Sequence, residues 1–169
     1  MDIKEVILLE HSKANKDVIV NWIGADQKRF GKLFDLFLNG DTIISQRASW
    51  PLSYAVQSNP FLINPYLGKL LKNLSKPNLH DAVKRNTLRL LHEISIPKRF
   101  CGLIMNTCFD YIVSPMEKPA IKAFSLTILY NFSRQYPEIK NELKTIIESN
   151  WDNESPAYKS RARKILKKL

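Results

Sequence analysis

The chain has 169 residues, of which 44% are hydrophobic, 25% are charged and only five are glycine. This length suits one domain that buries most of the surface of its unfolded chain, and the hydrophobic content argues against disorder. The 26 basic and 16 acidic residues give a formal net charge of +10. No run approaches the roughly 18 consecutive apolar residues of a membrane span, and residues 1–4 open no signal peptide. These features predict a soluble cytoplasmic protein with no membrane partner.

Three short helices are predicted in residues 2–40. The first includes Val6–Leu9, the second ends near Gly24, and the third is closed by Asn39 and Gly40. The third helix has an apolar stripe at helical spacing, formed by Phe30, Leu33, Phe34, Phe37 and Leu38. We interpret residues 1–41 as an irregular helical cap on the following helices, since terminal units of a helical stack need one. The alternative is a partner-binding helix built on the three phenylalanines.

From residue 42 onward, one pattern of a helix, a proline and a second helix recurs. Val83-Lys84-x-x-Thr87-x-x-Leu90-Leu91 returns as Ile121-Lys122-x-x-Ser125-x-x-Ile128-Leu129 and as Tyr158-Lys159-x-x-Ala162-x-x-Ile165-Leu166, at offsets of 38 and then 37. A weaker copy is Ser45-Gln46-x-x-Ser49-x-x-Leu52. A period of roughly 34 to 47 residues with two helices per unit is typical of helical solenoids.

The helix boundaries follow from prolines and capping residues. Asp81 is the predicted N-cap of the helix that carries Val83, and Pro60, Pro97 and Pro137 follow the first helices of the three units. The second helix of the first unit is predicted to start at Ile63 and to run through the leucines up to residue 74. The pattern predicts one domain, with repeat pairs at 42–78, 79–118 and 119–155 and a basic terminal helix at 156–169.

These residues resemble HEAT-type repeats, over about residues 42–169. The resemblance rests on the apolar-Lys-x-x-small-x-x-apolar-apolar core, on the Ser155-Pro156 lead-in and on Pro51 inside a first helix. It implies an all-α, right-handed α-α superhelix of about three helical pairs plus a terminal helix, usually with a protein-binding role. It also implies that the lysine shared by the copies, at 84, 122 and 159, bonds to neighbouring turns.

Charge is concentrated at the C-terminal end. Residues 157–169 contain no acid and six basic residues, which is more than half of the net charge: Lys159, Arg161, Arg163, Lys164, Lys167 and Lys168. These cations either compensate the helix dipole or bind an anionic partner, such as nucleic acid or an acidic protein.

A second basic set lies on the second helices, which line the concave side in HEAT-type stacks. It includes Lys69, Lys72, Lys140 and Lys144 as candidate contacts for an anionic partner, together with Lys98 and Arg99. Acids on the same helices interrupt it, namely Asp110, Glu138, Glu142 and Glu148. A positive groove therefore requires that the lysines align.

No residue pattern predicts a metal site, a cofactor site or a catalytic centre. Cys101 and Cys108 lie seven residues apart on one predicted helix, about 10 Å from each other, which is too far for a disulfide. His11, His80 and His92 have no partner at ligand spacing. We read the two cysteines as small core residues and the histidines as surface or core residues.

Two enzymatic interpretations remain to be weighed. Helical-repeat DNA glycosylases that excise alkylated bases resemble this architecture, and Asp110 with Tyr111, or Trp151 with Asp152, are the pairs that could serve in such a site. Residues 114–119 resemble the signature loop of the fumarase and adenylosuccinate lyase superfamily but lack its Met-Pro order and its Asn, so we expect no lyase activity. The sequence favours a non-catalytic scaffold that binds a protein, with a nucleic-acid binder or a DNA-repair glycosylase as the alternative.

Overall fold

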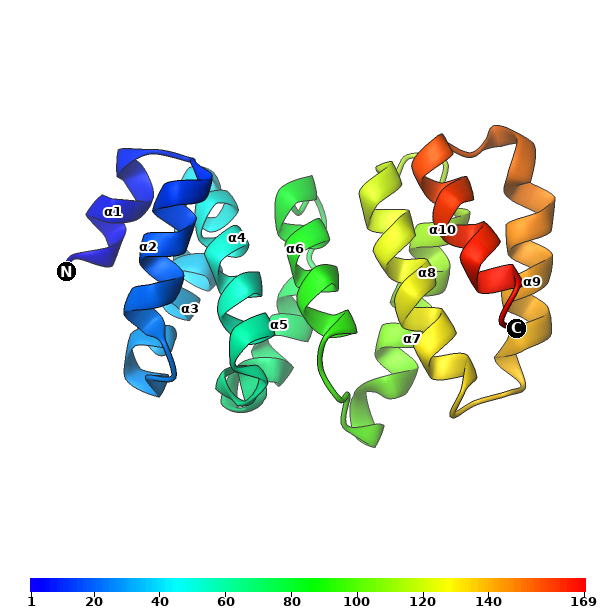
Figure 1. Ribbon diagram of the computed structural model, residues 1–169, viewed down its shortest axis with the longest axis horizontal. Coiled ribbons are helices and arrows are strands. Elements are labelled where there is room, and N and C mark those ends of the chain that lie inside the picture. The colour runs from blue at the N-terminus through cyan, green and yellow to red at the C-terminus, as the bar shows by residue number, and fades with distance from the viewer. The chain divides into compact units, whose positions relative to one another are not determined.

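The computed structural model describes residues 1–169, which form helices, turns and loops without a strand (Figure 1). The all-α prediction is confirmed, and neighbouring helices pack in pairs. The helices are α1 (Ile3–Leu9), α2 (Lys13–Ile23), α3 (Gln27–Asn39), α4 (Thr42–Ser58), the 3-10 helix η1 (Pro60–Tyr66), α5 (Leu67–Leu74), α6 (Asp81–His92), α7 (Lys98–Val113), α8 (Pro119–Ser133), α9 (Ile139–Asn150), the 3-10 helix η2 (Trp151–Asn153) and α10 (Pro156–Leu166). None of them is both long enough and apolar enough to cross a membrane.

The chain divides into two compact units, unit 1 (Met1–Ile94) and unit 2 (Ser95–Leu169). The division falls between α6 and α7, inside the segment 79–118 that the sequence predicts to be one repeat pair. The predicted repeat boundaries therefore stay a prediction, although the helices themselves lie where the apolar stripes place them.

Helix α4 is the centre of unit 1, where it packs against α1, α2, α3 and α6. The aromatic residues of α3 lie in this core: Phe30, Phe34 and Phe37 are each 2% exposed or less. Tyr66 closes the cluster, with its ring centroid 4.6 Å from that of Phe34. The hypothesis that these phenylalanines bind a partner is wrong, because packing within unit 1 already covers them.

Two local predictions in unit 1 are corrected. The cap of α6 is His80, whose Nδ1 accepts the Ala82 N–H at 3.1 Å, and Asp81 is already the first helical residue. The segment predicted as one second helix from Ile63 is divided into η1 and α5. Pro65 explains the division, since proline has no N–H to donate and disfavours α-helical geometry in the residue before it.

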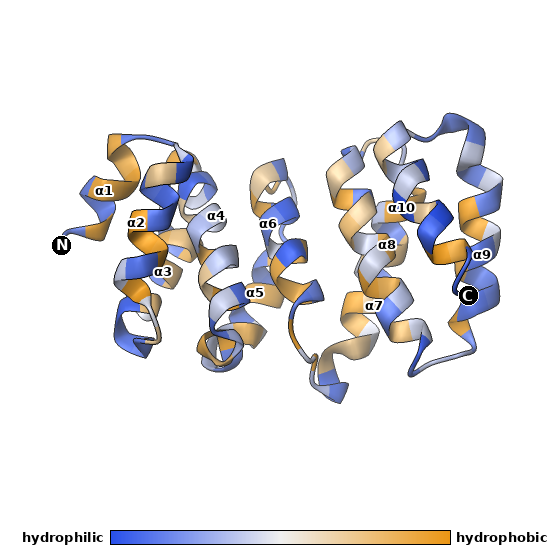
Figure 2. Cartoon of the chain, viewed as in Figure 1, coloured by the Kyte–Doolittle hydropathy of each residue, from blue (hydrophilic) through white to orange (hydrophobic).

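Helix α8 is the centre of unit 2, where it packs closely against both α7 and α10, while α9 contacts α7 and α8. The predicted apolar stripes form this core, whose buried residues include Cys101, Ile104, Cys108, Ile112, Ile121, Ile128, Leu129, Leu143, Ile147, Tyr158, Ala162 and Ile165. Both cysteines are free and buried. Figure 2 shows that much of α10 is hydrophilic, whereas α8 is mostly neutral or hydrophobic.

Candidate functional site

Helix α10 carries four of the six basic residues of the C-terminal segment, and Lys167 and Lys168 follow its last residue. It begins at Pro156, and the Ser155 hydroxyl caps it by accepting the Tyr158 N–H at 3.2 Å. Its apolar stripe, Tyr158, Ala162 and Ile165, is buried. The cations lie off that stripe, as predicted: Lys159 is half-buried, and the exposed ones are Arg161, Arg163, Lys164, Lys167 and Lys168.

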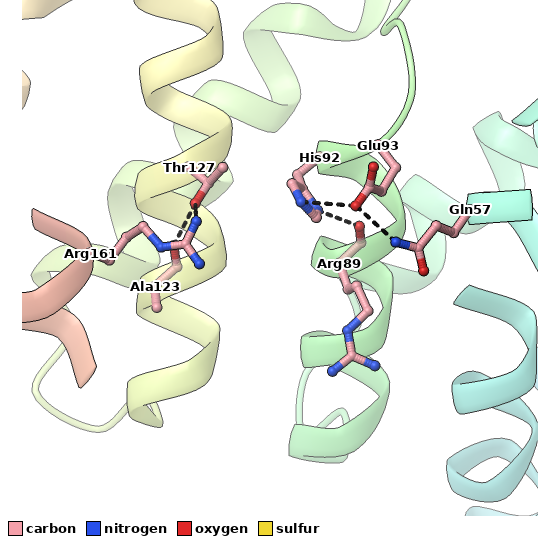
Figure 3. A network of polar contacts seen from close by, with 7 residues as sticks. All are labelled: Gln57, Arg89, His92, Glu93, Ala123, Thr127 and Arg161. Carbon is pink, nitrogen blue, oxygen red and sulfur yellow. Dashed lines mark hydrogen bonds and ion pairs between the residues drawn. The ribbon is translucent and has the colours of Figure 1, made fainter. Parts of the chain in front are cut away.

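Arg161 is held against α8 by a short relay of hydrogen bonds. Its guanidinium donates to Thr127 Oγ1 at 3.0 Å, and the Thr127 hydroxyl donates to the Ala123 carbonyl at 3.1 Å (Figure 3). The Arg161 side chain therefore has a defined position over α8, which lowers the entropy lost when it binds a further group.

Arg163 points to a different neighbour. Its guanidinium carbon lies 5.4 Å from the centre of the Trp151 ring, which is a cation–π distance. Arg161 and Arg163 thus contact different neighbours, α8 and η2 respectively.

A groove of about 310 Å³ lies between α8 and α10. Its lining residues are Ala120, Ala123, Phe124, Ala157, Ser160, Arg161 and Lys164. Neither helix contains Asp or Glu, so the groove combines small or apolar side chains with two cations and no acid.

An ion pair between Lys122 and Glu154 joins α8 to the segment before α10. The two side chains are only 7% and 8% exposed. The pair confirms, for Lys122, the expectation that this repeat lysine bonds to a neighbouring turn. The two charges of this pair neutralise each other, so the negative charge of Glu154 does not offset the surface cations of α10. The pair also lines a second cavity of about 420 Å³, which Glu117 lines too.

The lysines predicted for a concave lining are divided between the two units. Lys69 and Lys72 are exposed on α5 in unit 1, whereas Lys140 and Lys144 lie on α9 in unit 2. Lys140 donates to the Leu169 carbonyl at 3.4 Å, and Lys144 lies 3.9 Å from Glu148. A continuous positive groove built from these four lysines stays a prediction.

The residue pairs considered for a glycosylase show no acid held in a pocket. Asp110 and Asp152 are exposed, and Trp151 lies under Arg163. The pKa of Tyr111 is raised, first by burial and then by the negative charge of Glu117, which makes this phenol a poorer acid. No cluster of three or more His, Cys, Asp or Glu residues could hold a metal ion.

Sequence reasoning identified the cations of α10 but missed the α8 side of the groove. The sequence did contain a signal for the α8 side of the groove, since residues 119–133 contain no acidic residue. What the sequence did not reveal is that Ala120 and Ala123 lie beside Ala157 and Ser160.

Comparison with known proteins identifies a family but no individual relative. The HEAT repeat domain family matches residues 3–169, which extends the resemblance through the three N-terminal helices. No curated protein and no solved structure matches the chain. The match covers nearly all of the sequence and agrees with the paired packing of the helices. The chain therefore belongs to the HEAT repeat family.

Proposed function

We propose that the chain is a non-catalytic interaction module that binds a protein partner through the acid-free surface of α8 and α10. Helical repeats of this family present extended surfaces for docking, which supports a scaffold role. The observation that carries the proposal is the placement of the α10 cations beside a helix without acids. A cytoplasmic location stays a prediction.

The charge of unit 2 has a single source. Residues 95–155 contain seven basic and seven acidic residues, so the whole excess of unit 2 comes from the six cations of residues 157–169. A patch of one sign attracts partners of the opposite sign and raises their association rate.

Compensation of the helix dipole explains only part of this patch. Arg163 and Lys164 lie in the last turn of α10, where cations are favourable. Lys159 lies at the end of the first turn, where the dipole does not favour a cation, and Arg161 lies at the middle of the helix, where the dipole has little effect. A contact with an anionic partner gives these two residues a role that the dipole does not.

Crosslinking of the full chain in native extract, read by mass spectrometry, tests the proposal. We expect a reproducible protein partner crosslinked near residues 119–133 and 156–169, and its loss in a variant with Arg161, Lys164 and Lys168 changed to Gln. A variant with Lys69 and Lys72 changed to Gln is the control, because it removes exposed charge from unit 1 only. Crosslinks that map away from α8 and α10, or that survive the triple change, contradict the proposal.

A nucleic-acid binder is the second candidate, and the six cations of residues 157–169 favour it. Neutralised phosphates release counterions, so such binding weakens steeply with salt. A titration of the chain with duplex DNA and with single-stranded RNA at about 50 and about 200 mM salt tests it, because affinity would fall by several powers of ten for many phosphate contacts. An absence of binding at the lower salt removes this candidate, and incubation with alkylated DNA tests for base release in the same samples.

A further inference from the structure

We propose that the groove between α8 and α10 binds an extended acidic segment of the partner, with carboxylates at Arg161 and Lys164 and a small apolar side chain between the helices. This inference rests on the proposed protein-binding function and names the site and the ligand class. The groove holds about 310 Å³, which lies at the lower end of the range for ligand pockets, roughly 300 to 1,000 Å³.

The walls of the groove differ in character. The α8 wall consists of Ala120, Ala123 and Phe124, and the α10 wall carries Arg161 and Lys164. A ligand with carboxylates on one side and a small apolar group on the other matches both walls. Small side chains on both helices leave room for such a group.

Arg161 is prepared to receive a carboxylate. One of its terminal nitrogens donates to Thr127 at 3.0 Å, and a guanidinium has five N–H donors in a planar fork. The remaining donors suit a carboxylate, with which arginine forms bidentate, charge-assisted hydrogen bonds. The relay to Ala123 holds the side chain on α8 while they do so.

The spacing of the two cations suits alternate residues of an extended chain. Arg161 and Lys164 are three positions apart on α10, which puts their Cβ atoms about 5 to 6 Å apart. Alternate side chains of a strand project to the same side at intervals of about 6.6 Å. The expected motif is therefore acid, small apolar residue, acid, with the middle side chain facing α8.

The same walls argue against a phosphate backbone as the occupant. Phosphates pressed against Ala120 and Ala123 would lose hydration without gaining hydrogen bonds, which is unfavourable. A peptide instead buries an apolar side chain there, which is favourable. The α10 wall alone does not discriminate, because both ligands are anionic.

Fluorescence anisotropy with a labelled peptide of alternating Glu and Ala tests the proposal on the full chain. We expect binding that weakens with salt, no binding of the matching Gln and Ala peptide, and weaker binding of an oligothymidylate of equal charge. Arg161→Gln should lower the affinity for the acidic peptide about tenfold, since a bidentate charged contact is lost. Lys164→Gln should lower this affinity by a smaller factor.

A steric variant and matched controls separate this site from general attraction to a basic protein. Ala157 is exposed, so Ala157→Trp should fill the groove without altering the core and should reduce binding at least tenfold. Lys69→Gln and Lys144→Gln remove one charge each outside the groove and should change affinity less than twofold. Circular dichroism and the melting temperature of each variant confirm that the fold is kept.

Each other result has a defined meaning. The inference is overturned if the acidic peptide does not bind, or if the groove variants and the control variants lose the same amount of affinity for it. Tighter binding of the oligonucleotide, weakened by Arg161→Gln, assigns the surface to nucleic acid and also overturns it. A protein partner that crosslinks to α8 and α10 while the acidic peptide does not bind leaves the proposed function standing and rejects only the groove as its acidic-peptide site.

Discussion

The two units join their neighbouring helices by different means. In unit 1, α4 and α6 are linked by a neutral contact, in which Asn86 Nδ2 donates to Ser49 Oγ at 2.8 Å between buried side chains. In unit 2, α8 and the segment before α10 are linked by the buried ion pair of Lys122 with Glu154.

Surface cations are also treated differently in the two units. In unit 1, Arg89 lies 5.4 Å from the centre of the Tyr54 ring and donates to Asn86 Oδ1 at 3.2 Å. Burial lowers the pKa of Arg89, against an opposite effect of Tyr54 and together with a smaller lowering effect of Arg85. In unit 2, Arg161, Arg163 and Lys164 of α10 are exposed, and α10 packs against α8, a helix without acids. The comparison teaches that Arg89 serves the packing of unit 1, whereas these three cations of α10 remain exposed at the surface of unit 2.

The largest expected effect is the loss of the ion pair in unit 2. Glu154→Ala leaves Lys122 buried without its carboxylate, which should lower the free energy of unfolding by about 3 to 5 kcal/mol. Urea unfolding followed by circular dichroism measures this loss. Changing both residues, Lys122→Met with Glu154→Leu, should restore most of the stability, because no charge is then left unpaired. A double variant as unstable as Glu154→Ala would contradict this account.

Removal of the neutral contact in unit 1 should cost less. Asn86→Ala leaves the buried Ser49 hydroxyl without this donor and should lower the free energy of unfolding by about 1 to 3 kcal/mol. Hydrogen exchange should show faster exchange of the α4 and α6 amides, with the α8 amides unchanged. A cost above that of Glu154→Ala would reverse the proposed difference between the units.

Alkaline pH should weaken the fold through the buried thiol of Cys108. Burial raises the pKa of this thiol from 9.0 to about 12, against a smaller opposite effect of its hydrogen bond with Ser125. Above pH 9 the unfolded chain loses this proton while the folded chain keeps it, so the stabilising contribution is full below pH 9 and is lost as the pH rises toward 12. The loss is about 1.4 kcal/mol for each pH unit in that window.

Cys108→Ala tests the alkaline prediction by removing this titration. Urea midpoints compared at pH 8 and pH 10 should fall less for this variant than for the unchanged chain. An equal pH dependence of the Cys108→Ala variant and the unchanged chain would show that other groups cause the alkaline loss.

The smallest effect on stability is expected for three exposed lysines near the C-terminal end. Lys164, Lys167 and Lys168 changed together to Gln should alter the free energy of unfolding by less than about 0.5 kcal/mol, because all three side chains are exposed and lie off the apolar stripe. Thermal melting measures this. A large drop in melting temperature would mean that these lysines stabilise unit 2 rather than serve a partner.

The sequence by itself determined the helices and the residues that they bury. The apolar stripes at helical spacing located α6, α8 and α10, because a helix must bury its apolar side against another element, and a weaker copy of the same pattern located α4. Two local features were not predicted from the sequence. His80 caps α6 in place of Asp81, and Pro65 divides the second helix of the first predicted unit, because several nearby residues compete for each such role.

Only the tertiary structure decided which surfaces face each other. Arg161 bonds to Thr127 across 34 positions, and Lys122 pairs with Glu154 across 32. Periodicity reports which side of each helix is apolar, but not which polar side chains of two helices come within hydrogen-bonding distance. The groove exists because α8 and α10 pack side by side with small residues between them, and such contacts depend on the relative position of the two helices in space.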